Sequence, residues 1–67
     1  MDRSLIADID KDPQEAAIVK AIITMTDALG LDAIAEGVET NEELEELRRL
    51  GCNFAQGYLL GRPFDPL

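Results

Sequence analysis

Large apolar side chains recur in the first half of the chain at intervals of three or four residues: Ile18, Ile22, Met25 and Leu29, with the smaller Val19, Ala21 and Ala28 beside them. This spacing predicts an amphipathic helix that buries these residues against a sheet. Asp12 and Pro13 predict its first turn, because aspartate favours the N-cap and proline the first helical position. Gly30 predicts its end, since helices often terminate in a left-handed residue that glycine adopts easily.

A second set of elements follows this glycine. The short apolar run 31–35 predicts a buried strand, and leucines spaced three residues apart predict a helix over about 41–50. The leucine-glycine stop at 29–31 recurs at 50–52, which predicts a second strand over 52–56. A strand–helix–strand order requires parallel neighbouring strands joined by a right-handed crossover.

These elements predict an α/β fold class, with parallel strands that fit part of a closed barrel. Residues 1–9 are expected to form a short helical lead-in. The small side chains Ala33, Ala35 and Ala55 are expected to point into the crowded interior of the barrel. Parallel sheets are buried on both faces, so two such strands do not complete a domain. We therefore expect residues 1–67 to be one portion of an incomplete barrel.

The turn between the first predicted strand and the second helix carries the candidate chemistry. Thr40 and Glu43 have the spacing of a capping box, in which the hydroxyl accepts from the Glu43 amide and the carboxylate reaches back. Such turns lie at the carboxyl ends of parallel strands, where helix N-termini converge and ligands bind. Glu36 is therefore well placed for chemistry, and the repeat brings 56–58 to the same edge. The other open interpretation is that Glu36 and Glu39 only face water and complement a helix dipole.

Composition limits the classes of function. The chain of 67 residues has fourteen acidic and six basic residues and a net charge of −8, which argues against binding a nucleic-acid polymer or an anionic membrane through a basic patch. It has no histidine, so imidazole catalysis is excluded. Its single cysteine, Cys52, suits a reducing compartment, and no apolar stretch approaches the length of a membrane span. We therefore expect a cytoplasmic protein, with no membrane insertion in this segment.

Two charged stretches predict no site of their own. The aspartates of 8–12 alternate as in a calcium loop, but Pro13 stands where the EF-hand pattern needs glycine and Val19 where it needs glutamate. In the second helix the acids of 42–49 precede the arginines, an order that favours the helix dipole. These charged side chains, Glu43 included, are expected to face away from the core.

Three short motifs together resemble one known family. They are Ile-Ala-Glu-Gly-Val-Glu-Thr at 34–40, Gln-Gly-Tyr at 56–58, and Asp-Arg-Ser followed by two apolar residues at 2–6. This combination resembles the carboxy-terminal part of an EAL domain, over nearly the whole chain. The resemblance implies a partial (β/α)8 TIM barrel, from a family of phosphodiesterases that hydrolyse cyclic di-GMP to the linear dinucleotide pGpG.

The resemblance also implies roles for individual residues. Glu36 resembles a glutamate at or near the catalytic metals that acts as a general base or positions water, and Gln56 resembles a glutamine that reaches the same site. The family metals, Mg²⁺ or Mn²⁺, clamp the phosphodiester and lower the pKa of a bridging water. The residues implied to support the active-site loop or to bind substrate are Glu39, Thr40, Gly57, Tyr58, Arg62 and Pro63.

The same resemblance implies limits on activity. The family's Glu-Ala-Leu motif, metal-binding asparagine and paired aspartates have no counterpart here, and its lysine would fall just before Met1. A complete barrel of this type needs about 250 residues. We therefore expect the isolated chain to be inactive and to bind no metal tightly. The alternative is a non-catalytic module that self-associates, or that binds a complementing amino-terminal barrel half. A small enzyme of another class is a third hypothesis.

Overall fold

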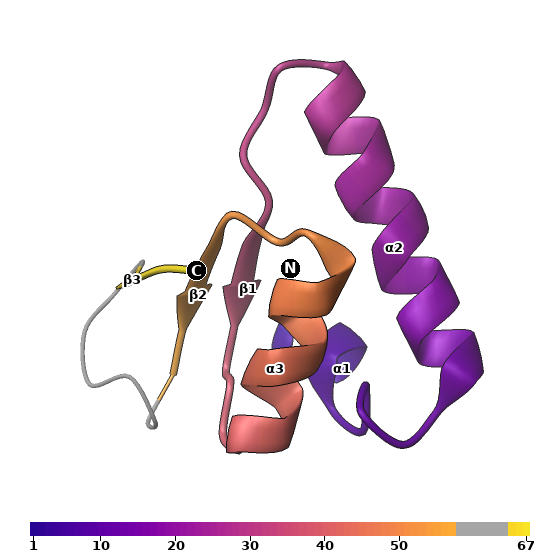
Figure 1. The fold of residues 1–67 in the computed structure, drawn as a ribbon, viewed down its shortest axis with the longest axis vertical. Coiled ribbons are helices and arrows are strands. Elements are labelled where there is room, and N and C mark those ends of the chain that lie inside the picture. The colour runs from indigo at the N-terminus through magenta and orange to yellow at the C-terminus, as the bar shows by residue number, and fades with distance from the viewer. Residues whose placement is uncertain (58–64) are drawn as a thin grey trace.

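From α2 to β2, helices and strands alternate along the chain, as the hydrophobic pattern predicts. The computed structural model describes residues 1–57 and 65–67 (Figure 1). In chain order its elements are α1 (Arg3–Ile6), α2 (Pro13–Ala28), β1 (Ile34–Glu36), α3 (Asn41–Leu50), β2 (Phe54–Gln56) and β3 (Asp65–Pro66). The predicted helix–strand–helix–strand order is confirmed. Within these residues, no helix combines the length and apolar character that crossing a membrane requires.

Local caps determine where the two longer helices begin. Asp12 is the N-cap of α2, and its Oδ1 accepts from the Gln14 N–H at 3.0 Å, with Pro13 in the first turn. Thr40 is the N-cap of α3, and its Oγ1 accepts from the Glu43 N–H at 3.1 Å. Both starts agree with the prediction, because a cap depends only on residues that are close in sequence.

The end of α2 determines where β1 can start. Gly30 has a φ of +72°, and the N–H of Leu31 donates to the Thr26 carbonyl at 2.8 Å, as in a Schellman motif. Because the backbone of Leu31 completes the helix end, the strand predicted over 31–35 cannot begin there. Strand β1 instead starts later and includes Glu36 as its last residue.

The sheet has the order β1-β2-β3. Strands β1 and β2 are parallel, and their register pairs Ile34 with Phe54, Ala35 with Ala55, and Glu36 with Gln56. Strand β3 runs antiparallel along the other edge of β2. The parallel pair is predicted from the sequence. Strand β3 is not, because no hydrophobic alternation marks so short a segment.

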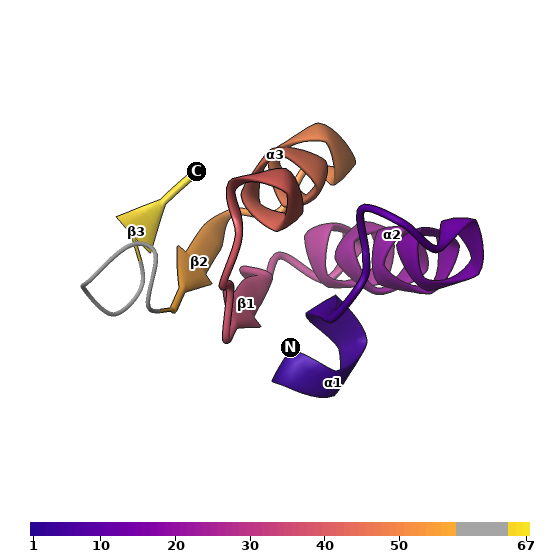
Figure 2. The same cartoon turned by 90° about the horizontal axis from the view of Figure 1, so that it is seen from below.

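Helices α2 and α3 cover the same side of the β1–β2 pair, as the two views in Figures 1 and 2 show together. Ala33, Ala35 and Ala55 are buried in the core on this side. The prediction that these alanines point into a barrel interior is therefore wrong: they face the helices, which small side chains allow to approach the strands closely. Side chains alternate along a strand, so the other face, called the open face below, carries Ile34, Glu36, Phe54 and Gln56.

The side of α2 that is buried is not the predicted one: it carries the residues one position later in the sequence. Val19 and Ile23 are buried, whereas Ile18 is 49% and Met25 58% exposed. Helix α2 carries apolar side chains on more than one side, so spacing alone cannot select the buried one. Helix α2 packs against both α1 and α3, and Val19 lies in the core that they share, so these neighbours select the side at Val19.

Candidate functional site

The candidate site lies where the two parallel strands end. Glu36 is the last residue of β1 and Gln56 the last residue of β2, and the register pairs them directly. Both follow a buried alanine, so both side chains project from the open face, on strands about 4.8 Å apart. Glu36 is exposed and Gln56 partly buried. The predicted convergence of these two residues at one edge is confirmed, and we call it the strand-end site.

Backbone hydrogen bonds hold the chain on both sides of Glu36. Its N–H donates to the Met1 carbonyl at 2.8 Å, and the amino terminus of Met1 donates to the Ile34 carbonyl. Beyond the strand, the Val38 N–H donates to the Gln56 carbonyl at 3.0 Å. The segment after β1 is thereby joined to the end of β2.

Two glycines allow these segments to approach closely. Gly37 has a φ of +79°, and a Cβ built on it would lie 2.7 Å from Cδ of Arg3. A Cβ on Gly57 would overlap the backbone nitrogen and oxygen of Val38. Gly57 therefore has a packing reason to lack a side chain, and its role in substrate binding stays a prediction.

Arg3 reaches the site from α1. Its Nη1 donates to the Gly37 carbonyl at 2.5 Å and to Oε1 of Glu43 at 2.9 Å, and its Nε lies 2.8 Å from Oε1 of Glu39. The same Glu43 oxygen accepts from the backbone N–H of Glu39 at 3.0 Å. We call Arg3, Gly37, Glu39 and Glu43 the arginine clamp.

The arginine clamp buries one carboxylate. Glu43 is 5% exposed, whereas the side chains of Arg3 and Glu39 are 38% and 48% exposed. Burial opposes ionisation of Glu43, but the Glu39 N–H and the Arg3 guanidinium outweigh it and hold the pKa of Glu43 below its ordinary value. The hydrogen bond to Glu43 raises the pKa of Arg3. The prediction that Glu43 faces away from the core is therefore wrong, because a cation from another helix compensates its burial.

The predicted capping box is present in an altered form. Thr40 accepts from the Glu43 N–H as predicted, but the Glu43 carboxylate accepts from Glu39, one residue before the cap. The Thr40 bond satisfies an N–H that the start of α3 would otherwise leave unpaired, and the Glu43 bond joins the segment before the cap to the first turn. Glu39 and Thr40 thus lie in the segment between β1 and α3, and their role in supporting the active-site loop stays a prediction.

Sequence reasoning missed the contacts of Arg3 with the segment after β1. This residue lies in the motif at 2–6, but 34 positions separate it from Gly37, and no periodic pattern links residues so far apart. The capping-box spacing placed Glu43 near the turn without indicating its partner. The remaining predicted site residues lie outside the described part of the chain: Tyr58, Arg62 and Pro63.

The strand-end site offers two oxygen ligands, the carboxylate of Glu36 and the amide oxygen of Gln56. Divalent magnesium prefers about six oxygen ligands in octahedral geometry. Across residues 1–57 and 65–67, no three histidine, cysteine, aspartate or glutamate side chains are grouped to hold a metal ion. The described residues therefore do not form a metal centre by themselves.

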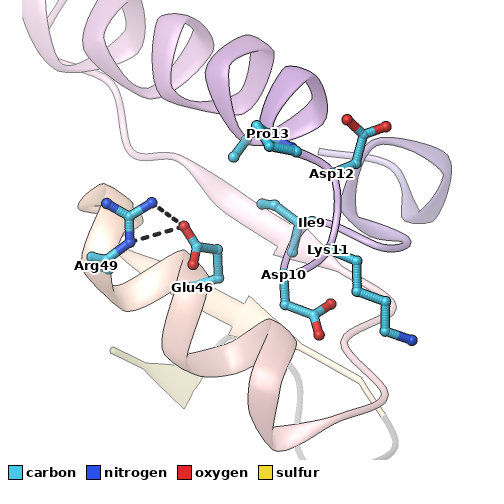
Figure 3. Close-up of a pocket in the computed structure, with 8 residues that line it drawn as sticks. Ile9, Asp10, Lys11, Asp12, Pro13, Glu46 and Arg49 are labelled. Atoms are coloured by element: carbon cyan, nitrogen blue, oxygen red, sulfur yellow. Dashed lines mark hydrogen bonds and ion pairs between the residues drawn. The ribbon is translucent and has the colours of Figure 1, made fainter.

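A separate hollow of about 210 Å³ lies between the start of α2 and the later turns of α3 (Figure 3). Asp10, Lys11 and Asp12 line one side of it. On the α3 side, Arg49 and Glu46 pair with each other, so their charges are already compensated. None of the predicted site residues in the described part of the chain lines this hollow.

One family model matches most of the chain. The family model described as "EAL domain" matches residues 1–63. The bifunctional diguanylate cyclase/cyclic di-GMP phosphodiesterase MucR of Pseudomonas aeruginosa is 51% identical over 63 residues, and the cyclic di-GMP phosphodiesterase RocR of the same organism is 36% identical over 63 residues. Each match covers 94% of this chain, but the chain spans only 9% of MucR and 16% of RocR.

Solved structures have the same fold. The MucR phosphodiesterase in complex with cyclic di-GMP superimposes with a TM-score of 0.83 at 50% identity, over 96% of this chain and 26% of that one. Klebsiella pneumoniae BlrP1, with calcium and cyclic di-GMP, superimposes with a TM-score of 0.89 at 38% identity, over 96% of this chain and 16% of that one. The predicted fold class, a partial (β/α)8 barrel, is confirmed.

Proposed function

The chain belongs to the EAL-domain family, and we propose from this that it supplies the last units of a barrel that hydrolyses cyclic di-GMP to linear pGpG. One observation carries the proposal: Glu36 and Gln56 are paired in register at the ends of parallel strands. Barrels of this class carry their catalytic groups at the carboxyl ends of the strands. MucR and RocR are named as cyclic di-GMP phosphodiesterases. The chain spans a small part of each, so the activity is proposed for a complete domain.

Residues 1–67 are proposed to be the carboxy-terminal portion of that barrel. The amino terminus of Met1 donates to the Ile34 carbonyl and its carbonyl accepts from Glu36 N–H, the two bonds of a parallel bridge opposite Ala35. A strand leading to Met1 would therefore continue the sheet beside β1. The open face would then face the barrel interior, where apolar side chains such as Phe54 would be covered.

The residue roles follow from this geometry. Glu36, exposed at the strand end, is proposed to act as general base toward the attacking water or to position it. Gln56, beside it, is proposed to donate from its amide to a phosphate oxygen. The segment with Glu39 and Thr40 supports them. The proposed substrate-binding residues are Gly57, Tyr58, Arg62 and Pro63.

The proposal includes a metal that the described residues cannot hold alone. We place Mg²⁺ or Mn²⁺ in the complete domain, with Glu36 at or near the ion and the other ligands on other strands. One solved relative, BlrP1, carries calcium together with cyclic di-GMP. The 67 residues on their own are proposed to be inactive, since Glu36 and Gln56 supply too few ligands.

A chimeric domain tests the proposal. Residues 1–63 would replace the matching segment of the MucR phosphodiesterase, and release of pGpG from cyclic di-GMP would be followed with Mg²⁺ or Mn²⁺. We expect turnover, and we expect Glu36→Gln to lower kcat by about 10²- to 10⁴-fold, the usual contribution of general base catalysis. Glu42→Gln, an equal charge change at an exposed position of α3, is the matched control. A folded chimera without turnover, or full activity of Glu36→Gln, would contradict the proposal.

A second candidate function is a self-associating, non-catalytic module. The observation that favours it is a row of exposed apolar side chains on α2 and just beyond its end: Ile18, Met25, Leu29 and Leu31. Exposed apolar rows of this kind are commonly covered by another protein surface. Sedimentation of the isolated chain tests this candidate. A self-associating module should sediment with more than the mass of one chain, whereas a chain that needs only the rest of the barrel should not.

A further inference from the structure

The segment that follows Glu36 is constrained from two sides. Toward β2, the Val38 N–H donates to the Gln56 carbonyl at 3.0 Å. On the other side, Arg3 donates to the carbonyl of Gly37 at 2.5 Å and pairs with the carboxylate of Glu39 at 2.8 Å. The residues directly after Glu36 are thus held by one backbone bond and by one arginine side chain.

The stem of Arg3 also packs on Gly37. A Cβ built on this glycine would lie 2.7 Å from Cδ and 2.9 Å from Cβ of Arg3, so the arginine covers the position where other residues carry a side chain. Glycine has the widest range of backbone angles, and Gly37 adjoins Glu36. If Arg3 is removed, Gly37 loses its covering group and its carbonyl partner, and the orientation of Glu36 is no longer restrained on that side.

A buried counterion keeps the arginine in place. Oε1 of Glu43 accepts from Arg3 at 2.9 Å and from the Glu39 N–H at 3.0 Å, and the Glu43 side chain is 6% exposed. Glu43 lies in the first turn of α3. The arginine clamp therefore connects α1, the segment after β1 and α3 at a single point.

We propose that Arg3 is a positioning residue for the strand-end site, which orients Glu36 through Gly37 and Glu39. The inference rests on the proposed phosphodiesterase function and adds to it a residue on a different element from Glu36 and Gln56. Arg3 is assigned no contact with substrate. The guanidinium suits the role because its planar fork serves a carbonyl and two carboxylates at once, which the single ammonium of lysine cannot do with the same geometry.

The test uses the active chimeric domain that carries residues 1–63. We expect Arg3→Gln to lower kcat by about ten- to a hundredfold, as misplacement of a reacting group does, with little change in the KM for cyclic di-GMP. Arg3→Lys should recover part of the lost kcat. Arg48→Gln is the matched control, because it removes an exposed arginine that pairs with Glu45 at 2.6 Å within α3. This control should retain kcat.

Each outcome bears on the inference. A kcat for Arg3→Gln equal to that of Arg48→Gln would overturn the inference. A change confined to KM would overturn it too, and so would a fall in kcat that only follows a fall in the unfolding temperature. If Arg3→Gln does not fold, Glu39→Gln provides the test. This variant removes the more exposed of the two carboxylates that pair with Arg3 and leaves the pair of Arg3 with Glu43 intact. It should still lower kcat several-fold. Failure of the unmodified chimera to turn over would instead contradict the proposed function itself.

Discussion

Glu43 combines deep burial with a retained charge, and this combination makes the stability of the protein depend on pH at one residue. Its side chain is 6% exposed, and its carboxylate accepts from Arg3 and from the Glu39 N–H. Burial opposes the charge, but these donors hold the pKa of Glu43 below its ordinary value of 4.5. A carboxyl group whose folded-state pKa is lowered stabilises the protein above the unfolded-state pKa, and this contribution is lost as the pH falls through the folded-state value.

Replacing Glu43 should therefore have a pH-dependent effect. We expect Glu43→Gln to reduce the free energy of unfolding of the chimeric domain by about 1.5–3 kcal/mol at pH 7, the usual cost of a lost charge-assisted hydrogen bond. The difference from the unmodified domain should begin to shrink below the ordinary carboxyl pKa of 4.5 and should be lost as the pH falls through the lowered folded-state pKa of Glu43. Urea unfolding between pH 3 and pH 7 measures it.

The matched control for this prediction is Glu42→Gln, in the same helical turn but exposed. It should change stability by a few tenths of a kcal/mol only. An effect of Glu43→Gln that stays constant down to pH 3, or that equals the effect of Glu42→Gln, would show that the lowered pKa of Glu43 does not contribute to stability.

At the scale of helices and strands, the success of sequence reasoning depends on how local the determining contacts are. The starts of α2 and α3 are predicted because Asp12 and Thr40 bond to residues two and three positions ahead. The buried side of α2 is not predicted, because it depends on the packing of α2 against α1 and α3, which lie elsewhere in the sequence. The parallel pairing of β1 with β2 is predicted because the repeated leucine-glycine stop places both strands in equivalent positions. The arginine clamp is not predicted, since it joins segments that are far apart in the sequence and that no local pattern links.

The contact between the end of β2 and the segment after β1 depends on Gly57. A Cβ there would overlap the Val38 backbone rather than a movable side chain, so Gly57→Ala should separate the two segments. We expect a loss of about 1–3 kcal/mol in the free energy of unfolding, typical of overpacking, measured without ligand in the chimeric domain.

Gly30→Ala is a useful comparison for Gly57→Ala. Gly30 has open space around its Cβ position and a φ of +72°, so its substitution costs only backbone strain, about 1–2 kcal/mol, and should leave kcat unchanged. Gly57→Ala should lower kcat as well, because it displaces Gln56. Unchanged stability with a raised KM would instead favour the substrate-binding role predicted for Gly57.

At the scale of the whole molecule, the described chain has two surfaces that a small protein rarely leaves uncovered. One is the open face of β1 and β2, which the barrel proposal covers with further strands. The other is the row on α2 and just beyond it, where Met25 is 58%, Leu29 66% and Leu31 58% exposed. Helix α2 lies at the outside of the molecule in both views (Figures 1 and 2), so this row is accessible to a second copy.

The isolated chain is therefore expected to self-associate through α2. At micromolar concentration its sedimentation mass should exceed the 7.3 kDa of one chain, because pairing two such rows removes apolar surface from water. The double variant Met25→Gln with Leu29→Gln should sediment as a monomer. Ala17→Gln with Thr24→Gln, exposed on another side of the same helix, should leave the association unchanged. A monomeric unmodified chain would contradict self-association, whereas equal loss in both double variants would place the contact elsewhere than this row.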